Sequence, residues 1–298
     1  TYITQHRGLT HSWLMLPLWS LLLAWILSRL WRDPRGVRPY LGVLALGIGI
    51  HILGDWITSF GTMMLAPLSN ERFPLGTTFI IDLLFTGIIL VGLLASALWR
   101  GSRVPALLGL VVLGAYVAFQ WMQLQRAIEF GEQYAQSQAF SNYQVSALPR
   151  PVSPFNWTVF IATDERYHVA HVNLLRTNTP APAAANDSIF RRLSAGYRAL
   201  RDAQWQVIER FGEDAAARAL AREAWSQREF SFYRWFAAFP QLDHIEHGNP
   251  VTCVWFRDAR FDIPGRNMRL FHYGLCRETG EPRWRVYKLN EDGTKAAI

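Results

Sequence analysis

Four long apolar segments place the strongest constraint on how this chain can fold. They cover roughly residues 12–30, 40–60, 75–99 and 104–124. A helix needs about 20 residues to cross a bilayer, and each segment has about that length. Tryptophans stand near their ends, as in an interfacial aromatic belt: Trp13, Trp31, Trp56, Trp99 and Trp121. The sequence therefore excludes a single soluble globular domain and predicts an α-helical transmembrane bundle of about four spans.

The rest of the chain has the composition of soluble protein. Only 18% of all residues are charged, against about 25% in soluble domains, and the deficit lies in the apolar region. Prolines at 149, 151 and 154 mark a break. We therefore predict a transmembrane domain over residues 1–124, a helical and Pro-rich linker over 125–154, and a soluble α+β domain with an antiparallel sheet over 155–298.

Within the soluble region, the residue patterns predict individual elements. A hairpin is expected around Asp164-Glu165, and a helical stretch is expected over 187–236. Three strands are expected over 251–263, 268–276 and 284–289, whereas the segment around His244 and His247 is expected to be a loop. Cys253 and Cys276 fall in neighbouring predicted strands. Both a disulfide and two buried thiols are compatible with that placement.

The basic residues predict an orientation in the membrane. The net charge of +7 comes from arginine, because lysine occurs only at Lys288 and Lys295. Arginines crowd the first connection (29–39) and the third (100–103), whereas the second connection (63–74) holds one Glu and one Arg. The positive-inside rule then places the C-terminal domain outside the cytoplasm, in a multi-pass protein of the bacterial inner membrane. Arginines that flank spans do not require a nucleic-acid partner, and none is expected. The first residue is Thr, so we expect a segment upstream of it.

Histidines and carboxylates recur inside or beside the apolar segments. His6 and His11 precede the first span, His51 and Asp55 share one face of the second, and Asp82 lies in the third. The predicted orientation places all five near the outer face. Because a charge at the bilayer centre costs about 2.5–3.5 kcal/mol or more, such residues persist where they pair, bind or react. The five predict a divalent metal site, most readily for Zn²⁺, with Mn²⁺ or Mg²⁺ as alternatives.

Each polar residue has an expected role at such a site. Asp55 or Asp82 would orient water or act as a base, and Arg7 or Arg72 would hold a phosphate. The ligands would be supported, or the substrate contacted, by Thr10, Thr58, Ser59, Thr62 and Arg72. Simpler explanations remain open: a histidine in a span can be a helix–helix contact, and Asp82 can pair with Arg7 or Arg72. A metal-dependent hydrolase, a membrane anchor that binds another envelope protein, and a transporter are therefore all compatible with the sequence.

Three motifs resemble one known family. They are His6-Arg-Gly-Leu-Thr-His11-Ser12, His51-x-x-Gly-Asp55 followed by Thr58-Ser-Phe-Gly61-Thr62, and Pro67-Leu-Ser69-Asn-Glu-Arg72 with Ile80-Ile-Asp82 after it. Together they resemble the YdjM-like membrane-bound metal-dependent hydrolases over about residues 1–90. A weaker likeness to the soluble tails of some members covers Trp255 to Phe261. Members usually carry a Pro-Asp-x-Asp motif upstream, which this sequence lacks.

The resemblance implies a chemistry. The family is distantly similar to zinc-dependent phospholipase C and the P1-type nucleases, so it implies phosphoester hydrolysis. Asp55 would then bind or bridge metal, with His51, His11 and His6 as further ligands. The substrate would be a small molecule or a lipid reached from the bilayer. A second metal candidate, independent of the resemblance, is the run Asp243-His244-x-Glu246-His247 in the soluble region.

Overall fold

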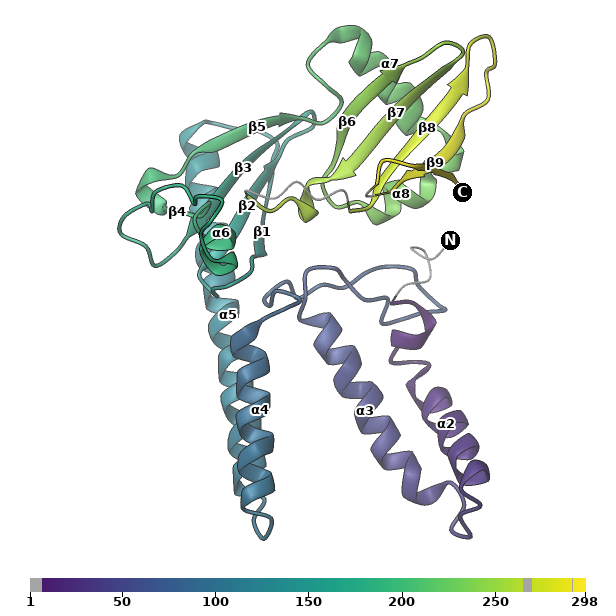
Figure 1. Cartoon of the computed structure of the whole chain (residues 1–298), viewed down its shortest axis with the longest axis vertical. Coiled ribbons are helices and arrows are strands. Elements are labelled where there is room, and N and C mark those ends of the chain that lie inside the picture. The colour runs from purple at the N-terminus through teal and green to yellow at the C-terminus, as the bar shows by residue number, and fades with distance from the viewer. Residues whose placement is uncertain (1–6, 265–269, 291) are drawn as a thin grey trace. The chain divides into compact units, whose positions relative to one another are not determined.

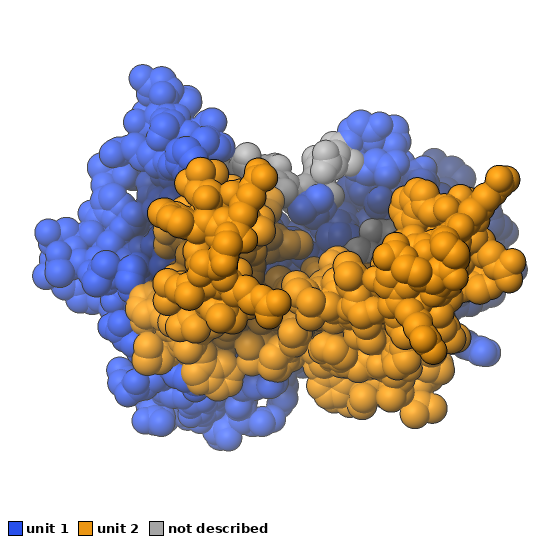
Figure 2. Space-filling view, turned by 90° about the horizontal axis from the view of Figure 1, so that it is seen from below, with its two compact units in different colours: residues 1, 125–298 blue, residues 2–124 orange. Residues whose placement is uncertain are grey.

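The computed structural model describes residues 7–264, 270–290 and 292–298. Its elements divide into two compact units: an N-terminal unit over residues 2–124 and a C-terminal unit that holds residues 125–298 (Figures 1 and 2). The N-terminal unit contains the short 3-10 helix η1 (Leu9–His11) and the helices α2 (Leu16–Leu30), α3 (Arg38–Trp56), α4 (Leu83–Leu98) and α5 (Val104–Ser137), of which α5 continues into the C-terminal unit.

Apolar side chains cover the outside of these helices. Two of them, α3 and α5, are long and apolar enough to span a bilayer, whereas α2 and α4 are shorter. Only 11% of the apolar stretch of α3 and 6% of that of α5 is buried within the structure, so these helices are not the core of a soluble domain. The structure thus confirms a helical N-terminal region with two candidate spans.

Small residues let neighbouring helices approach. A Cβ added at Gly109 of α5 would lie 3.3 Å from the Cα of Gly92 in α4. At Gly49 of α3, an added Cβ would meet side chains of Trp13 and Leu16 at 3.6 Å. Because lipid tails are as apolar as leucine, close packing of this kind replaces the hydrophobic effect as the force between membrane helices.

The third apolar segment corrects one sequence prediction. The span expected from residue 75 begins only at Leu83, because Gly76 takes a φ of +71° and the preceding chain is extended. Isolated β-bridges join Thr58 to Thr78 and Thr62 to Phe73. Residues 57–82 therefore form an irregular connection held by backbone pairing, and Asp82 caps α4 instead of lying inside a span.

The C-terminal unit contains two five-stranded sheets. In the first sheet the order is β1-β2-β3-β4, and β5 also pairs with β3; in the second it is β10-β9-β8-β7-β6. All pairs are antiparallel except β3 with β4. The strands are β1 (Gln144–Pro149), β2 (Asn156–Ala162), β3 (Arg166–Asn173), β4 (Arg198–Ala199), β5 (Trp205–Glu209), β6 (Pro240–His247), β7 (Val251–Asp258), β8 (His272–Glu278), β9 (Arg285–Leu289) and β10 (Lys295–Ala297). The predicted antiparallel α+β architecture is confirmed.

Short helices lie between these strands. They are α6 (Ile189–Ser194), η2 (Leu200–Asp202), α7 (Ala215–Ser226), η3 (Arg228–Phe230), α8 (Ser231–Phe236) and η4 (Ala259–Phe261). The helical stretch expected over 187–236 was therefore wrong in part, because β4 and β5 pair with β3 inside it. The loop expected around His244 is strand β6, whose bulge between Leu242 and His244 interrupts the alternation that would have revealed it.

The two sheets of the C-terminal unit are joined by packing and by buried polar contacts. Phe160 of β2 stacks on Phe239 at 4.0 Å between ring centroids, and the hydroxyl of Tyr167 donates to the carbonyl of Pro240 at 3.1 Å. On the second sheet, Cys253 and Cys276 are directly opposite one another and form a disulfide. The sequence was compatible with a disulfide or with two buried thiols, and the structure has the disulfide.

Candidate metal centre

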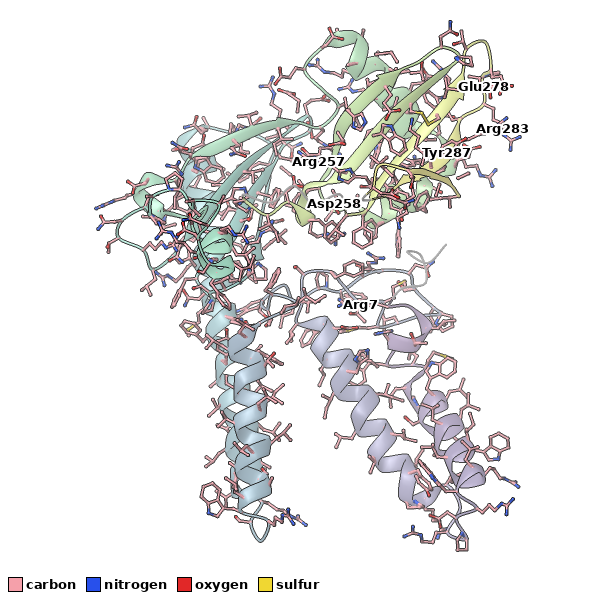
Figure 3. The ribbon with its side chains drawn as sticks, in the orientation of Figure 1. Arg7, Arg257, Asp258, Glu278, Arg283 and Tyr287 are labelled. Carbon is pink, nitrogen blue, oxygen red and sulfur yellow. A yellow bond between two sulfur atoms is a disulfide. The ribbon has the colours of Figure 1, made fainter. Side chains whose placement is uncertain are left out.

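Three segments of the N-terminal unit bring histidines and a carboxylate together. η1 supplies His11, the last two turns of α3 supply His51 and Asp55, and the connection 57–82 follows α3 directly. The N–H of Met63 donates to the carbonyl of Arg7 at 3.1 Å, which ties the N-terminal segment to that connection. Figure 3 labels Arg7 in these segments, beside the end of α3.

The side chains of His11, His51 and Asp55 converge on one point. His11 Nε2 lies 3.1 Å from Asp55 Oδ2 and 3.0 Å from His51 Nε2. His51 Nε2 lies 3.9 Å from the same carboxylate oxygen. Within the described parts of the chain, no other group of three His, Cys, Asp or Glu side chains gathers its ligand atoms this closely. We call this group the His11–His51–Asp55 cluster.

Neighbouring polar groups fix the orientation of these side chains. The Oγ1 of Thr10 lies 2.8 Å from His11 Nδ1, so a proton on Nδ1 leaves the lone pair of Nε2 directed at the cluster. Arg7 is 6% exposed, and its Nη2 lies 2.9 Å from Asp55 Oδ1, opposite the oxygen that faces the histidines. Nη1 of Arg7 also donates to Thr58 Oγ1 at 2.8 Å.

The spacing of the three ligand atoms fits a single metal ion. Zinc binds imidazole nitrogen and carboxylate oxygen at about 2.0–2.2 Å, which places tetrahedral ligands about 3.3 Å apart. The observed separations of 3.0, 3.1 and 3.9 Å bracket that value. His51 is 63% exposed, so one side of the cluster is open. Two imidazoles and one carboxylate with an open position are the ligand set of catalytic zinc sites.

Two arginines flank the cluster on an aromatic ring. The guanidinium carbons of Arg7 and Arg72 lie 4.9 and 5.0 Å from the ring centroid of Phe60. Gly61 follows with a φ of +85°, and an added Cβ would come within 2.9 Å of the Cβ of Arg72. This glycine therefore lets the Arg72 segment pass close to the end of α3. Of the other expected supporting residues, Thr62 is buried and pairs with Phe73 through the backbone.

Asp82 is not part of this cluster. Its Oδ1 accepts hydrogen bonds from the backbone N–H groups of Leu84 and Phe85, as a helix cap does. Its Oδ2 accepts from Tyr116 at 2.9 Å and from Gln120 at 2.7 Å, both on α5. Neutral donors therefore satisfy the carboxylate, which takes neither the expected place in the metal site nor the alternative pairing with Arg7 or Arg72. His6 lies outside the described residues.

Sequence reasoning overlooked the partners of Asp82 and one anchor of the cluster. Tyr116 and Gln120 are four residues apart in an apolar helix, and that i, i+4 polar pair was a usable signal. Ser12 donates through its hydroxyl to the carbonyls of Met64 and Ala66, at 3.0 and 2.6 Å. It stands next to His11 in the first motif, so its position in the sequence also pointed to it.

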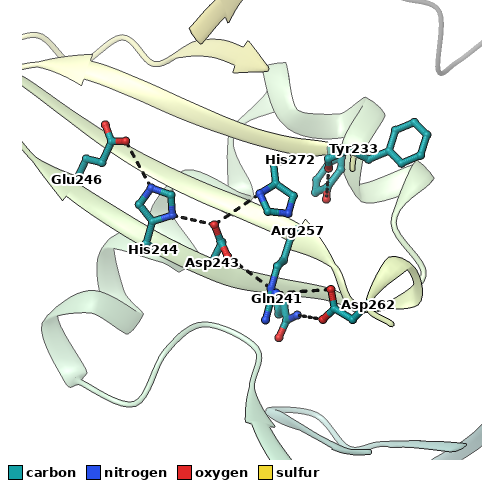
Figure 4. A network of polar contacts seen from close by, with 9 residues as sticks. Tyr233, Gln241, Asp243, His244, Glu246, Arg257, Asp262 and His272 are labelled. Atoms are coloured by element: carbon teal, nitrogen blue, oxygen red, sulfur yellow. Dashed lines mark hydrogen bonds and ion pairs between the residues drawn. The ribbon is translucent and has the colours of Figure 1, made fainter. Parts of the chain in front are cut away.

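The second histidine-rich run forms an extended network instead of a cluster (Figure 4). His244 Nδ1 lies 2.8 Å from Asp243 Oδ2, and its Nε2 lies 3.4 Å from Glu246 Oε1. His272 Nδ1 lies 3.6 Å from the same Asp243 oxygen. Both carboxylates of the network also pair with basic residues: Arg257 lies 3.5 Å from Asp243, and Lys295 pairs with Glu246. These carboxylates already have cationic partners.

Comparison with known proteins supports the reading of the N-terminal region. Residues 1–127 match the model of a family described as YdjM inner membrane protein. The match confirms the family resemblance seen in the motifs, and together with the two candidate spans it supports a membrane protein.

One curated protein matches the chain significantly. It is an uncharacterised protein, YfhP, of Bacillus subtilis (strain 168), which is 25% identical over 196 residues. The alignment covers 62% of this chain and spans 57% of the length of that relative. No solved structure matches the chain significantly.

Proposed function

Starting from the match of residues 1–127 to the YdjM inner membrane protein family, we propose that the chain is a membrane-bound metal-dependent hydrolase of phosphoesters. The observation that carries the proposal is the convergence of His11, His51 and Asp55 on one open position. A resident zinc ion would supply a water of lowered pKa and polarise a phosphoryl oxygen. Mn²⁺ or Mg²⁺ would serve the same purpose.

The side chains of the site have separate roles in this proposal. His11, His51 and Asp55 hold the ion, and Thr10 keeps the His11 lone pair directed at it. Arg7 is a positioning residue, because its guanidinium is buried against Asp55 and Thr58. Arg72, whose guanidinium lies over the ring of Phe60, binds the charged oxygens of the substrate. Asp82 positions the start of α4 and does not touch the reacting atoms.

We further propose that α2, α3, α4 and α5 all span the membrane and that the C-terminal unit lies outside the cytoplasm. The short connections at Arg32–Arg38 and Arg100–Arg103 carry the arginines that favour the cytoplasmic side. The disulfide between Cys253 and Cys276 favours an oxidising compartment. The substrate is then a phosphoester at the outer face of the inner membrane, reached from the lipid or from the periplasm.

Metal content tests the hydrolase proposal. Elemental mass spectrometry of the detergent-purified chain should give about one zinc or manganese per chain, and the double variant H51A/D55A should give none. The matched control is D243A/H244A, which removes a His/Asp pair from the second network and should keep the metal. Hydrolysis of bis-p-nitrophenyl phosphate should follow the metal. A folded wild-type chain without stoichiometric metal would overturn the proposal and leave an anchor or a transporter.

Topology is tested separately. Fusions to alkaline phosphatase, which is active only outside the cytoplasm, and to green fluorescent protein, which is fluorescent inside, should be made at Ser102 and at Ile298. We expect phosphatase activity at Ile298 and fluorescence at Ser102. The reverse pattern, or the same side at both positions, would contradict the proposed orientation.

A further inference from the structure

The C-terminal unit carries a small apolar surface that the proposed function does not use. Leu175 follows β3 and is 65% exposed, and Ile189 and Phe190 of α6 are 40% and 53% exposed. Most large apolar side chains of this unit are buried in its two sheets. These three are exceptions, and their exposure makes them candidates for a contact with a partner outside the unit.

Hydrogen bonds hold these residues in one place. Arg176, directly after Leu175, donates to the carbonyl of Ser194 at 2.9 Å and to its hydroxyl at 2.8 Å. Ser194 is the last residue of α6, and Ser188 caps the first turn by accepting from the N–H of Arg191. The two exposed segments are therefore parts of one fixed surface, which we call the α6 surface: Leu175, Ile189, Phe190, Arg191 and Arg192.

The charge around the apolar residues is positive. Arg191 and Arg192 follow Phe190 directly, and both are exposed. Arg191 pairs with Asp187 at 2.8 Å, so Arg192 adds to the net charge. Residues 175–202 contain five arginines and two aspartates. An apolar tip surrounded by arginine matches the boundary between anionic headgroups and acyl chains.

The chain enters the C-terminal unit at the end of the first sheet where the α6 surface lies. Near the end of α5, Tyr134 and Phe140 contact His168 of β3. Earlier in α5, Phe130 stacks on Trp205, which pairs with Ala170, further along β3. Within the C-terminal unit, going back along α5 from Tyr134 to Phe130 therefore corresponds to going along β3 from His168 past Ala170 toward Asn173, the last residue of that strand.

From these observations we propose that the α6 surface rests on an anionic lipid bilayer. Leu175, Ile189 and Phe190 enter the interface, and Arg191 and Arg192 contact lipid phosphates. This contact is independent of metal binding and hydrolysis. It would fix the C-terminal unit against the membrane by a second attachment beside α5.

Site-directed spin labelling tests this contact on the full chain. A nitroxide is attached at Phe190→Cys, with Val207→Cys as the matched control, because Val207 on β5 is also apolar and 53% exposed. The two native cysteines form the disulfide and do not react without reductant. The chain is reconstituted in nanodiscs of phosphatidylcholine with a quarter phosphatidylglycerol. Oxygen, which partitions into lipid, and a water-soluble nickel chelate then compete as relaxation agents.

The expected result is a difference between the two labels. At position 190 the label should be relaxed several-fold more by oxygen than by nickel, and at position 207 more by nickel. The charge reversal R191E/R192E should bring position 190 to the behaviour of position 207. Nickel access at 190 equal to that at 207 would overturn the proposal. Protection of 190 from both agents would overturn it as well, because it would indicate a protein covering this surface.

Discussion

The molecule has two groups of histidines and carboxylates, and they differ in how their charges are balanced. In the His11–His51–Asp55 cluster, three side chains from two segments point at one open position, and Arg7 binds the far carboxylate oxygen of Asp55. On the second sheet, the contacts run in a line from Glu246 to His244, then to Asp243 and then to His272 (Figure 4). Arg257 and Lys295 neutralise its carboxylates.

The difference teaches that residue type does not decide function. Both groups contain two histidines and at least one aspartate, yet only the first leaves ligand atoms at metal-binding distances with one side open. An α-helix brings residues i and i+4 to the same face, so His51 and Asp55 converge. On strand β6, His244 and Glu246 are two residues apart on one sheet face, and they lie side by side without enclosing a point.

The substitution Asp55→Asn should separate the two groups most strongly. It removes a ligand and the carboxylate charge that pairs with the buried Arg7, so we expect loss of metal and a destabilisation of about 3 kcal/mol. Asp243→Asn, in the more open network, should keep the metal and cost less than about 1 kcal/mol. Elemental analysis and chemical unfolding of the purified variants measure both quantities. Equal effects of the two substitutions would contradict the distinction.

The next prediction concerns the disulfide, whose loss should lower the stability of the C-terminal unit alone. It closes a loop between residues 23 positions apart, which stabilises a fold by about 3 kcal/mol. The double variant C253S/C276S should lower the unfolding free energy of the sheet-rich unit by that amount and leave the metal content unchanged. Denaturant unfolding followed by tryptophan fluorescence provides the measurement. Loss of metal in this variant would show that the two regions depend on each other.

A smaller effect tests the orientation of the cluster. Thr10→Val removes the oxygen beside His11 Nδ1 and so should weaken metal binding about 10- to 100-fold without abolishing it. Thr10→Ser, which keeps a hydroxyl at this position, should bind nearly as wild type. Competition with a chelator of known affinity gives both constants. Equal affinities for the valine and serine variants would exclude an orienting role for Thr10.

Local patterns predicted the helical region and part of the cluster. The apolar segments predicted the starts of the four helices to within eight residues, and the i, i+4 spacing placed His51 and Asp55 on one face. The sequence also indicated that Asp82 needs a partner. It did not identify Tyr116 and Gln120, because pairing between α4 and α5 depends on how two helices pack and not on a local pattern.

The secondary structure of the soluble region was harder to predict, again because it depends on pairing between segments far apart in the sequence. Strand β5 is only five residues long and half exposed, so it has no strong alternation, and its pairing with β3 decides its conformation. Asp82 illustrates a further limit: an acidic residue inside an apolar run can be buried in a span or can cap its first turn. Only the extended chain before it, set by Gly76 and the bridge of Thr78, distinguishes the two.

A further expected effect concerns proton uptake in the C-terminal unit. His171 of β3 is packed between Thr158 and the ring of Tyr197, and burial, with the nearby charge of Arg150, lowers its pKa to about 3. Because the unfolded chain takes up this proton at about pH 6.5, stability is fully present above that pH and is lost as the pH falls toward 3. The unfolding free energy should change by about 1.4 kcal/mol per pH unit for one proton.

In His171→Asn, the unfolding free energy measured between pH 6 and pH 4 should change with pH by that much less. An unchanged dependence on pH would show that His171 is protonated in the folded chain. The same series on Asp55→Asn should keep the wild-type slope of the sheet-rich unit, because His171 lies outside the N-terminal unit.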